Sequence, residues 1–188
     1  MTRCSRAVAL ATLGGLGCGA DLGGGVGIEP RTANAVAFYR AAASTKLGTP
    51  LNNEGLLVGA ALESRTEAHR GVRYDASVML GYGRGPATLD GRWGIEAYLE
   101  GGTPVRGGFF PNWDFLLGAT LATPIFFGSP RQVADLNTST WFASKRLELV
   151  PMLRARMHWD HPPGEDSVTR LDLQVGATLR LRVLSDLF

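Results

Sequence analysis

The residues of this chain that could do chemistry are few and scattered. The stretch HWDH, residues 158–161, brings two imidazoles and a carboxylate together, and these are metal ligands and acid–base groups. His158 and His161 differ in parity, however, so on a strand they would point to opposite faces. Two prolines follow directly. The sequence favours a tryptophan at a membrane interface followed by a polar loop over a metal or acid–base site.

Motifs for nucleophilic or phosphate chemistry are also missing. There is no Gly-x-Ser-x-Gly elbow, and the sequence places no histidine beside Ser77 or Ser167. The glycines of GYGRG, residues 81–85, are not followed by the Lys-Ser/Thr of a phosphate loop. Both cysteines, Cys4 and Cys18, lie at the N-terminus, which leaves no thiol for a site in the rest of the chain. We therefore predict no enzyme, no metal and no cofactor.

Ionisable residues with a regular spacing are more informative. In three segments they recur at alternate positions, and apolar residues occupy the other parity. A carboxylate or guanidinium on a face that meets lipid would be very costly, so we expect these residues to face inward and form ion pairs. The candidates for such a lumen are Glu96, Glu100, Arg154, Arg156, Asp172, Arg180 and Arg182.

A period of two requires strands to position these residues. The clearest strand is residues 170–183, RLDLQVGATLRLRV, which is roughly 43 Å long at about 3.3 Å per residue. Ordinary strands have about 5–6 residues, whereas a tilted membrane strand needs about 9–11 to cross the bilayer. We expect its apolar parity to face lipid, namely Leu171, Leu173, Val175, Leu179, Leu181 and Val183.

Turn clusters divide the rest of the chain into similar segments. The expected strands are residues 35–47, 56–65, 74–83, 93–100, 113–127, 145–159 and 170–183. Pro124 must lie at the end of its strand or at a weak ladder position. Bacterial barrels prefer even strand numbers, and the eighth strand could lie in 25–31, within 134–144, or in a turn hidden within 113–127. The predicted fold is all-β, a closed up-and-down antiparallel barrel of eight strands.

Aromatic residues lie near the ends of these segments, as in the girdles of membrane barrels. The residues concerned are Tyr74, Trp93, Trp113, Phe126, Phe127, Trp141 and Trp159.

The first 20 residues have the features of an export signal. Arg3 and Arg6 precede a short apolar run and then small residues. Residues 15–18 are similar to a degenerate lipobox in which Cys18 would be lipidated, whereas small residues at 18 and 20 would allow cleavage before Asp21. We expect an export signal at 1–20, a Gly-rich linker at 21–34 and the barrel domain at 35–188.

Over residues 33–188 this pattern resembles that of small bacterial outer-membrane β-barrels. Phe188 is similar to the terminal aromatic that the barrel-assembly machinery recognises, although it shares the parity of Arg180 and Arg182. The resemblance implies an outer-membrane location, outer-membrane lipids and the barrel-assembly machinery as partners, and a structural, adhesive or interaction role. A barrel of this size has at most a narrow pore. The formal charge of +2, without a Lys/Arg run, does not indicate nucleic acid as a partner.

Two alternatives remain open at this point. A lipid-anchored or soluble periplasmic barrel of lipocalin-like shape would have the opposite polarity, with apolar residues lining a ligand cavity. An outer-membrane enzyme acting on lipids would need scattered residues to converge at one rim. Arginines in or beside expected loops could bind lipopolysaccharide phosphates, although solvated loop charge is the more common explanation for them: Arg65, Arg70, Arg73, Arg84, Arg92 and Arg106.

Overall fold

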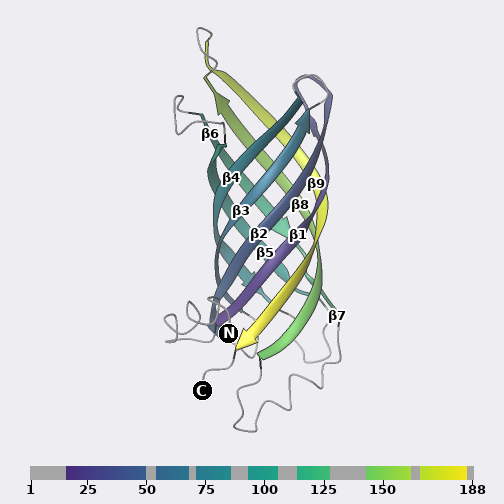
Figure 1. Ribbon diagram of the computed structural model, residues 1–188, viewed down its shortest axis with the longest axis vertical. Helices are drawn as coiled ribbons and strands as arrows, with labels where there is room; N and C mark the ends of the chain where they lie inside the picture. Colours follow the sequence, from purple (N-terminus) through teal and green to yellow (C-terminus); the bar gives the residue numbers. More distant parts are fainter. Residues whose placement is uncertain are drawn as a thin grey trace.

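The computed structural model describes residues 16–49, 54–67, 71–85, 93–105, 114–127, 143–161 and 166–185. These residues form nine strands in one sheet that curls into a tall barrel (Figure 1). The strands are β1 (Leu16–Glu29), β2 (Asn34–Thr49), β3 (Glu54–Glu67), β4 (Gly71–Arg84), β5 (Ile95–Pro104), β6 (Phe115–Ala122), β7 (Ile125–Phe127), β8 (Ala143–Asp160) and β9 (Val168–Ser185).

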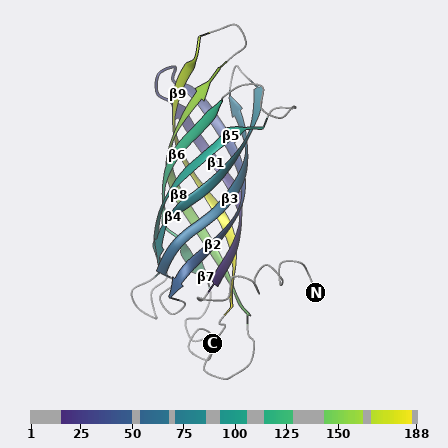
Figure 2. The same ribbon diagram turned by 90° about the vertical axis from the view of Figure 1, so that its left-hand side faces the viewer.

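The barrel is closed and antiparallel throughout. Each strand from β1 to β6 pairs with the next, β8 pairs with β6, β7 and β9, and β9 returns to β1. The view turned by 90° shows the wall continuing across β4, β5 and β6 (Figure 2). Because β7 continues the line of β6 against β8, the nine strands occupy eight strand positions around the barrel. The predicted eight-stranded fold is therefore confirmed.

The ladder register fixes the slope of the strands. One circuit of paired residues starts at Leu16 on β1 and returns to β1 at Val26, a stagger of ten residues. The circuit passes through Leu47, Leu56, Tyr82, Ala97, Leu121, Leu153 and Val175. A stagger of this size in an eight-stranded barrel corresponds to a strand tilt of about 40°.

The expected linker is wrong, because residues 16–29 form β1, the missing eighth strand. The barrel therefore begins before residue 35, and Cys18 lies within β1, opposite Thr45 and Val183. The many glycines that suggest a linker have a packing role instead. A Cβ atom at Gly25 would lie 2.2 Å from the carbonyl oxygen of Val175 on β9. Glycine thus permits a close approach between the first and last strands.

The seven predicted strands are confirmed, with one interruption. Residues 123 and 124 separate β6 from β7, and Pro124 occupies this break, as its missing N–H requires. The register against β8 is the same on both sides, since Ala122 pairs with Met152 and Ile125 with Leu149. The break is therefore a local loss of pairing and not a turn.

Candidate functional site

The lumen is the distinctive feature of this barrel, because it is filled mainly with charged side chains. Among the described residues, those buried in it include Asp21, Arg40, Lys46, Glu63, Arg65, Asp75, Glu96, Glu100, Glu148, Arg154, Arg156, His158, Asp160, Arg170, Asp172 and Arg180. They come from seven different strands, at alternate positions of each. Two charged clusters result, with an apolar layer between them.

The first charged cluster, which we call the terminal cluster, lies in the half of the barrel where β1 begins and β9 ends. Arg180 is at its centre: its Nη1 is 2.8 Å from a Glu96 carboxylate oxygen and its Nε donates to Asp21 at 2.5 Å. Glu148 lies 3.5 Å from the same guanidinium, and Lys46 Nζ is 2.8 Å from Glu96. The ladder pairs Arg180 with Asp21 on one side and Glu148 on the other, so register alone brings these three together.

An apolar layer follows the terminal cluster along the barrel axis. It consists of Ala42, Leu57, Ala61, Met79, Tyr98, Ala122, Val150 and Met152, all buried. Val150 is completely inaccessible to solvent. This layer separates the terminal cluster from the charges nearer the β1–β2 turn.

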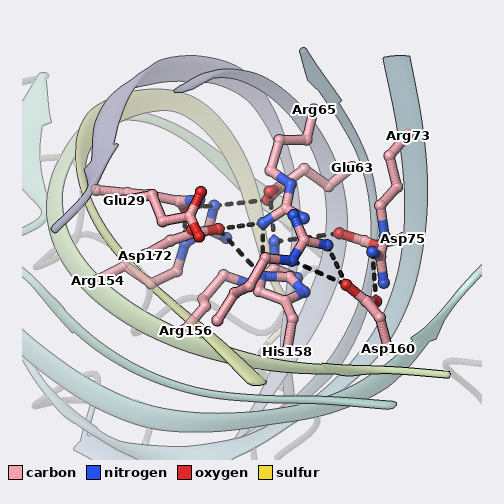
Figure 3. A network of polar contacts seen from close by, with 12 residues as sticks. Glu29, Glu63, Arg65, Arg73, Asp75, Arg154, Arg156, His158, Asp160 and Asp172 are labelled. Carbon is pink, nitrogen blue, oxygen red and sulfur yellow. Dashed lines mark hydrogen bonds and ion pairs between the residues drawn. The ribbon is translucent and has the colours of Figure 1, made fainter. Parts of the chain in front are cut away.

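The second and larger charged cluster, the distal network, occupies the other half of the lumen (Figure 3). Glu63 is a shared acceptor, with its two carboxylate oxygens 2.6 Å from Arg154 and 2.5 Å from Arg156. Glu100 lies 2.8 Å from Arg40 and 3.6 Å from Arg154. Arg40, Arg154 and Arg156 each meet both Glu63 and Glu100, and such sharing offsets the cost of burying a charge.

The distal network continues to the rim through two further groups. Arg73 contacts Asp75 at 3.0 Å and Asp160 at 2.6 Å, and Arg170 also donates to Asp160. Nearby, Arg65 donates to Asp172, whose carboxylate is 3.2 Å from His158.

Phe38 joins the distal network to the glycine-rich seam of β1 and β9. The Arg154 guanidinium lies 4.6 Å above the Phe38 ring, a cation–π geometry. The ladder places Gly25 beside Phe38 and Gly176 beside Gly25, and a Cβ added at either glycine would lie within 3 Å of the same ring. The two glycines thus provide the space that the ring occupies.

The outer wall is apolar. Large exposed hydrophobic side chains occur on every long strand, for example Leu22, Leu62, Val78, Leu99, Leu117, Leu153 and Leu179. Along β8, the run from Leu147 to Trp159 spans about 30 Å of the barrel axis, taking roughly 3.3 Å per residue and a tilt of about 40°. Membrane barrels have an apolar band of about 25 Å.

Aromatic residues lie at both ends of this apolar band. At the end nearer the β1–β2 turn, the rings of Phe115 and Trp159 stack with centroids 4.3 Å apart, and Tyr74 is exposed. At the end with the termini, Trp93 and Phe127 are exposed. Phe126 departs from the expectation, since it is buried in the lumen. Trp113 and Trp141 lie outside the described residues.

The structure brings together most of the residues expected to line the lumen. Glu96 meets Arg180, and Glu100 meets Arg154 and Arg156. Asp172 differs, because its cation is Arg65 and not one of the four expected arginines. The side chain of Arg182 is outside the described part. The residues expected to face lipid lie on the outer surface, namely Leu171, Leu173, Val175, Leu179 and Leu181, while the side chain of Val183 is not described.

Several lumen residues escape the sequence-based prediction. Arg65 and Arg73 were expected in or beside loops, but strands β3 and β4 extend past them and both side chains turn inward. His158 is buried beside Asp172, while His161 at the rim is partly exposed and faces Asp114. Outward-facing Leu62 precedes Glu63, so alternation could have identified Glu63, whereas Arg65 lies between Ser64 and Thr66 and has no apolar neighbour. Arg70, Arg92, Arg106 and His69 lie outside the described residues.

Among the described residues, no three His, Cys, Asp or Glu side chains are arranged to hold a metal ion. Within the same part of the chain, no helix is long and apolar enough to cross a membrane. No family model, curated protein or solved structure matches this chain.

Proposed function

We propose that this chain is an integral outer-membrane β-barrel with a plugged lumen and a structural, adhesive or interaction role. The observation that carries the proposal is the inverted polarity of the barrel. Arg180 and Glu96 are 2% and 0% exposed inside, whereas Leu179 and Leu173 are 53% and 43% exposed outside. A wall of this kind is unfavourable in water but matches a hydrocarbon solvent.

The lipocalin-like alternative requires the opposite arrangement. Its ligand cavity would be lined by the apolar parity, and its charged parity would face water. The apolar side chains of β9, including Leu171 and Val175, lie outside, and Asp172 and Gln174 between them are buried. The burial pattern therefore supports the membrane-spanning function over a soluble carrier.

The packed lumen supports a closed barrel over a pore. The two charged clusters and the apolar layer leave side chains such as Val150, Glu148 and His158 with no accessible surface. An open aqueous channel would instead leave them hydrated. We expect no measurable ion conductance in planar bilayers under conditions in which a wide porin gives clear steps.

Membrane extraction and gel mobility test the proposal directly. The protein is expressed in a Gram-negative host behind a conventional cleavable leader, and envelopes are washed with carbonate. We expect it to remain in the pellet, and its unboiled detergent-solubilised form to migrate differently from the boiled form in SDS gels. Release by carbonate together with unchanged mobility would contradict membrane integration.

A Cys18→Ser variant, compared with the wild type when both carry the chain's own N-terminal segment in place of that leader, separates an integral barrel from a lipid-anchored one. If acylation at Cys18 were the only attachment, the variant would appear in the soluble fraction. An integral barrel stays in the pellet whether or not residue 18 can be acylated. The same comparison measures acylation itself, since the mass of the wild-type N-terminal peptide would exceed that of the variant by the attached lipid.

A further inference from the structure

The outer wall of the barrel contains a hollow where β2, β3, β4 and β5 lie side by side. Its volume is about 640 Å³, within the range of about 300–1,000 Å³ that is typical of ligand pockets. Ala60 is at the middle of β3, so the hollow lies at mid-height in the apolar band. The small outward-facing residues that line it are Ala41, Ala43, Ala60, Ala76 and Gly101.

The ladder register gathers these small residues on the four strands. Ala43 pairs directly with Ala60, and Gly101 pairs with Val78, the next residue in the same row. A Cβ added at Gly101 would meet nothing within 4 Å, so the space in front of this strand is open. The hollow therefore results from small side chains on a regular sheet and not from a break in the ladder.

A second copy of this chain would fill the hollow poorly. In a symmetric dimer the same patch meets itself, so two hollows would face each other and enclose a void. Close packing disfavours such voids. A flexible alkyl chain can instead follow the shape of the hollow, and small residues allow it to approach the backbone closely.

A row of three hydroxyl groups borders the hollow on the side nearer the β1–β2 turn. Tyr39 pairs with Ser64 and Ser64 pairs with Tyr74, and this row is two residues along the strands from Ala41 and Ala76. No described residue forms a hydrogen bond with these three hydroxyls. Tyr39 is 70% exposed, and a polar group without a partner in hydrocarbon costs free energy. We therefore expect an acceptor from outside the chain.

The hydroxyl row slopes from the end of the apolar band toward its centre. Tyr74 lies among the aromatic residues at that end of the band. Each strand step of about 4.8 Å on a tilt of about 40° changes the height by about 3 Å, so Tyr39 lies roughly 6 Å deeper than Tyr74. An amphiphile with its polar group near the interface and its apolar part directed toward the midplane matches this arrangement.

We propose that the hollow binds one ester-linked phospholipid of the membrane. One acyl chain lies in the hollow, and an ester carbonyl accepts hydrogen bonds from the hydroxyl row. The carbonyl can only accept and the hydroxyls of Tyr39 and Ser64 can donate, so the two are complementary. The inference rests on the proposed membrane location, and its test separates the two.

Photocrosslinking compares the hollow with an ordinary part of the wall. The probe is a diester phosphatidylcholine with a diazirine in one acyl chain, at the same small mole fraction in vesicles of either diester or diether phosphatidylcholine that contain the refolded full-length protein. Diether lipids lack the ester carbonyl, and one hydrogen bond corresponds to about a fivefold preference. Crosslinking at Ala76 should therefore be about fivefold stronger in diether vesicles. Crosslinking at Leu153, on β8 across the barrel from β3, should be the same in both.

The other outcomes of this experiment are equally informative. Equal crosslinking of Ala76 in the two kinds of vesicle would overturn the lipid site and leave the membrane proposal intact. Protection of Ala76 while Leu153 reacts, together with crosslinks between two protein chains, would assign the hollow to a second copy and also overturn the lipid site. The absence of crosslinks at both residues would overturn the membrane proposal as well.

Removal of the hydroxyls tests the polar part of the site. The double variant Tyr39→Phe, Ser64→Ala keeps the ring and removes two of the three donors, so the fivefold difference at Ala76 should be lost. Tyr82→Phe is the matched control, because it removes an outward-facing hydroxyl that donates to Glu54 and does not border the hollow. A fivefold difference that persists in the double variant would contradict the role of the hydroxyl row.

A larger side chain in the hollow tests the apolar part. Ala60→Leu should displace the acyl chain and abolish the fivefold difference at Ala76. Ala155→Leu is the matched control, since Ala155 lies on β8 and pairs with outward-facing Ala119. Heat-modifiable gel mobility verifies that both variants are folded. The same difference at Ala76 in both variants would overturn the hollow as the binding site.

Discussion

Single charged residues in the lumen are held by partners on other strands, so removing one leaves the others buried and uncompensated. Arg180 illustrates this, because Asp21, Glu96 and Glu148 all surround its guanidinium. Breaking a buried ion pair by removing one partner typically costs about 3–5 kcal/mol. Surface charges have no comparable effect.

We therefore expect Arg180→Gln to lower the free energy of unfolding by about 3 kcal/mol or more. Urea-induced unfolding in detergent micelles, followed by tryptophan fluorescence, measures the change. Arg84→Gln is the control, since the Arg84 side chain is 58% exposed and its nearest carboxylate, on Glu54, lies 3.7 Å away. A similar loss in both variants would mean that the terminal cluster contributes nothing specific.

Glycines on the β1–β9 seam provide a second test at the scale of the residue. A Cβ at Gly25 would lie 2.2 Å from the Val175 carbonyl oxygen and 2.9 Å from the Phe38 ring, while one at Gly101 would meet nothing within 4 Å. Gly25→Ala should therefore destabilise the barrel by roughly 1–3 kcal/mol. Gly101→Ala should leave the unboiled gel mobility and its thermal midpoint unchanged. Equal tolerance of the two substitutions would show that the close approach is not required.

At the scale of the element, β1 closes the barrel and also contains the candidate processing site. Residues Leu16–Ala20 pair with Leu181–Ser185. Cleavage before Cys18 would remove only two residues of this ladder, whereas cleavage before Asp21 would remove five and leave the end of β9 without its partner on that side. The geometry of β1 favours processing at Cys18.

Two shortened proteins test this point. We expect a chain that starts at Cys18 to refold in detergent with a thermal midpoint near that of the longer form. A chain that starts at Asp21 should unfold at a lower temperature, because five ladder positions against β9 are lost. The midpoint is read from the loss of the unboiled band in SDS gels. Equal midpoints would remove the structural argument for Cys18.

The alternation in the sequence predicts most elements but not β1. Strands with large apolar residues on one face, such as β5, β8 and β9, carry a clear period of two. In β1 the inward positions include Gly23, Gly25 and Gly27, which carry no side chain and so hide the period. Composition alone then suggests a linker, and only the tertiary pairing with β9 shows that glycine is required there.

For the lumen, parity predicts which residues face inward but not which ones meet. Arg154 and Glu63 are far apart in sequence and belong to strands that are not neighbours in the sheet. Their contact depends on the width and stagger of the closed barrel. Arg65 lies between Ser64 and Thr66, so no apolar alternation marks it, and Arg73 precedes the expected start of its strand at Tyr74.

At the scale of the whole molecule, the apolar outer wall makes stability depend on the surrounding solvent. Val175 is 57% exposed on β9 and lies among outward-facing apolar neighbours. An arginine on the lipid face lowers the free energy of unfolding by about 2–4 kcal/mol at the midplane of a bilayer and by about 0–1 kcal/mol near its interfaces. We expect Val175→Arg to show the larger loss. The comparison substitution, Thr169→Arg, is at the exposed start of the same strand.

Urea titration of both variants in vesicles measures this difference. In vesicles, Val175→Arg should lose far more free energy of unfolding than Thr169→Arg. The difference between the two variants should be smaller when the protein is refolded in short-chain detergent without lipid. Equal costs at the two positions would argue against a membrane-buried wall, whatever the fold.

The pairing of Leu16 with Ser185 means that the chain is suited to circular permutation. The start of β1 and the end of β9 meet at one rim as neighbouring strands, so the closed barrel does not impose the order in which its eight strand positions are translated. A short peptide could join these ends, and a new start could be cut in the turn between β8 and β9 without breaking any ladder. Such a permuted gene would encode the same cylinder, with β9 made first and β8 last.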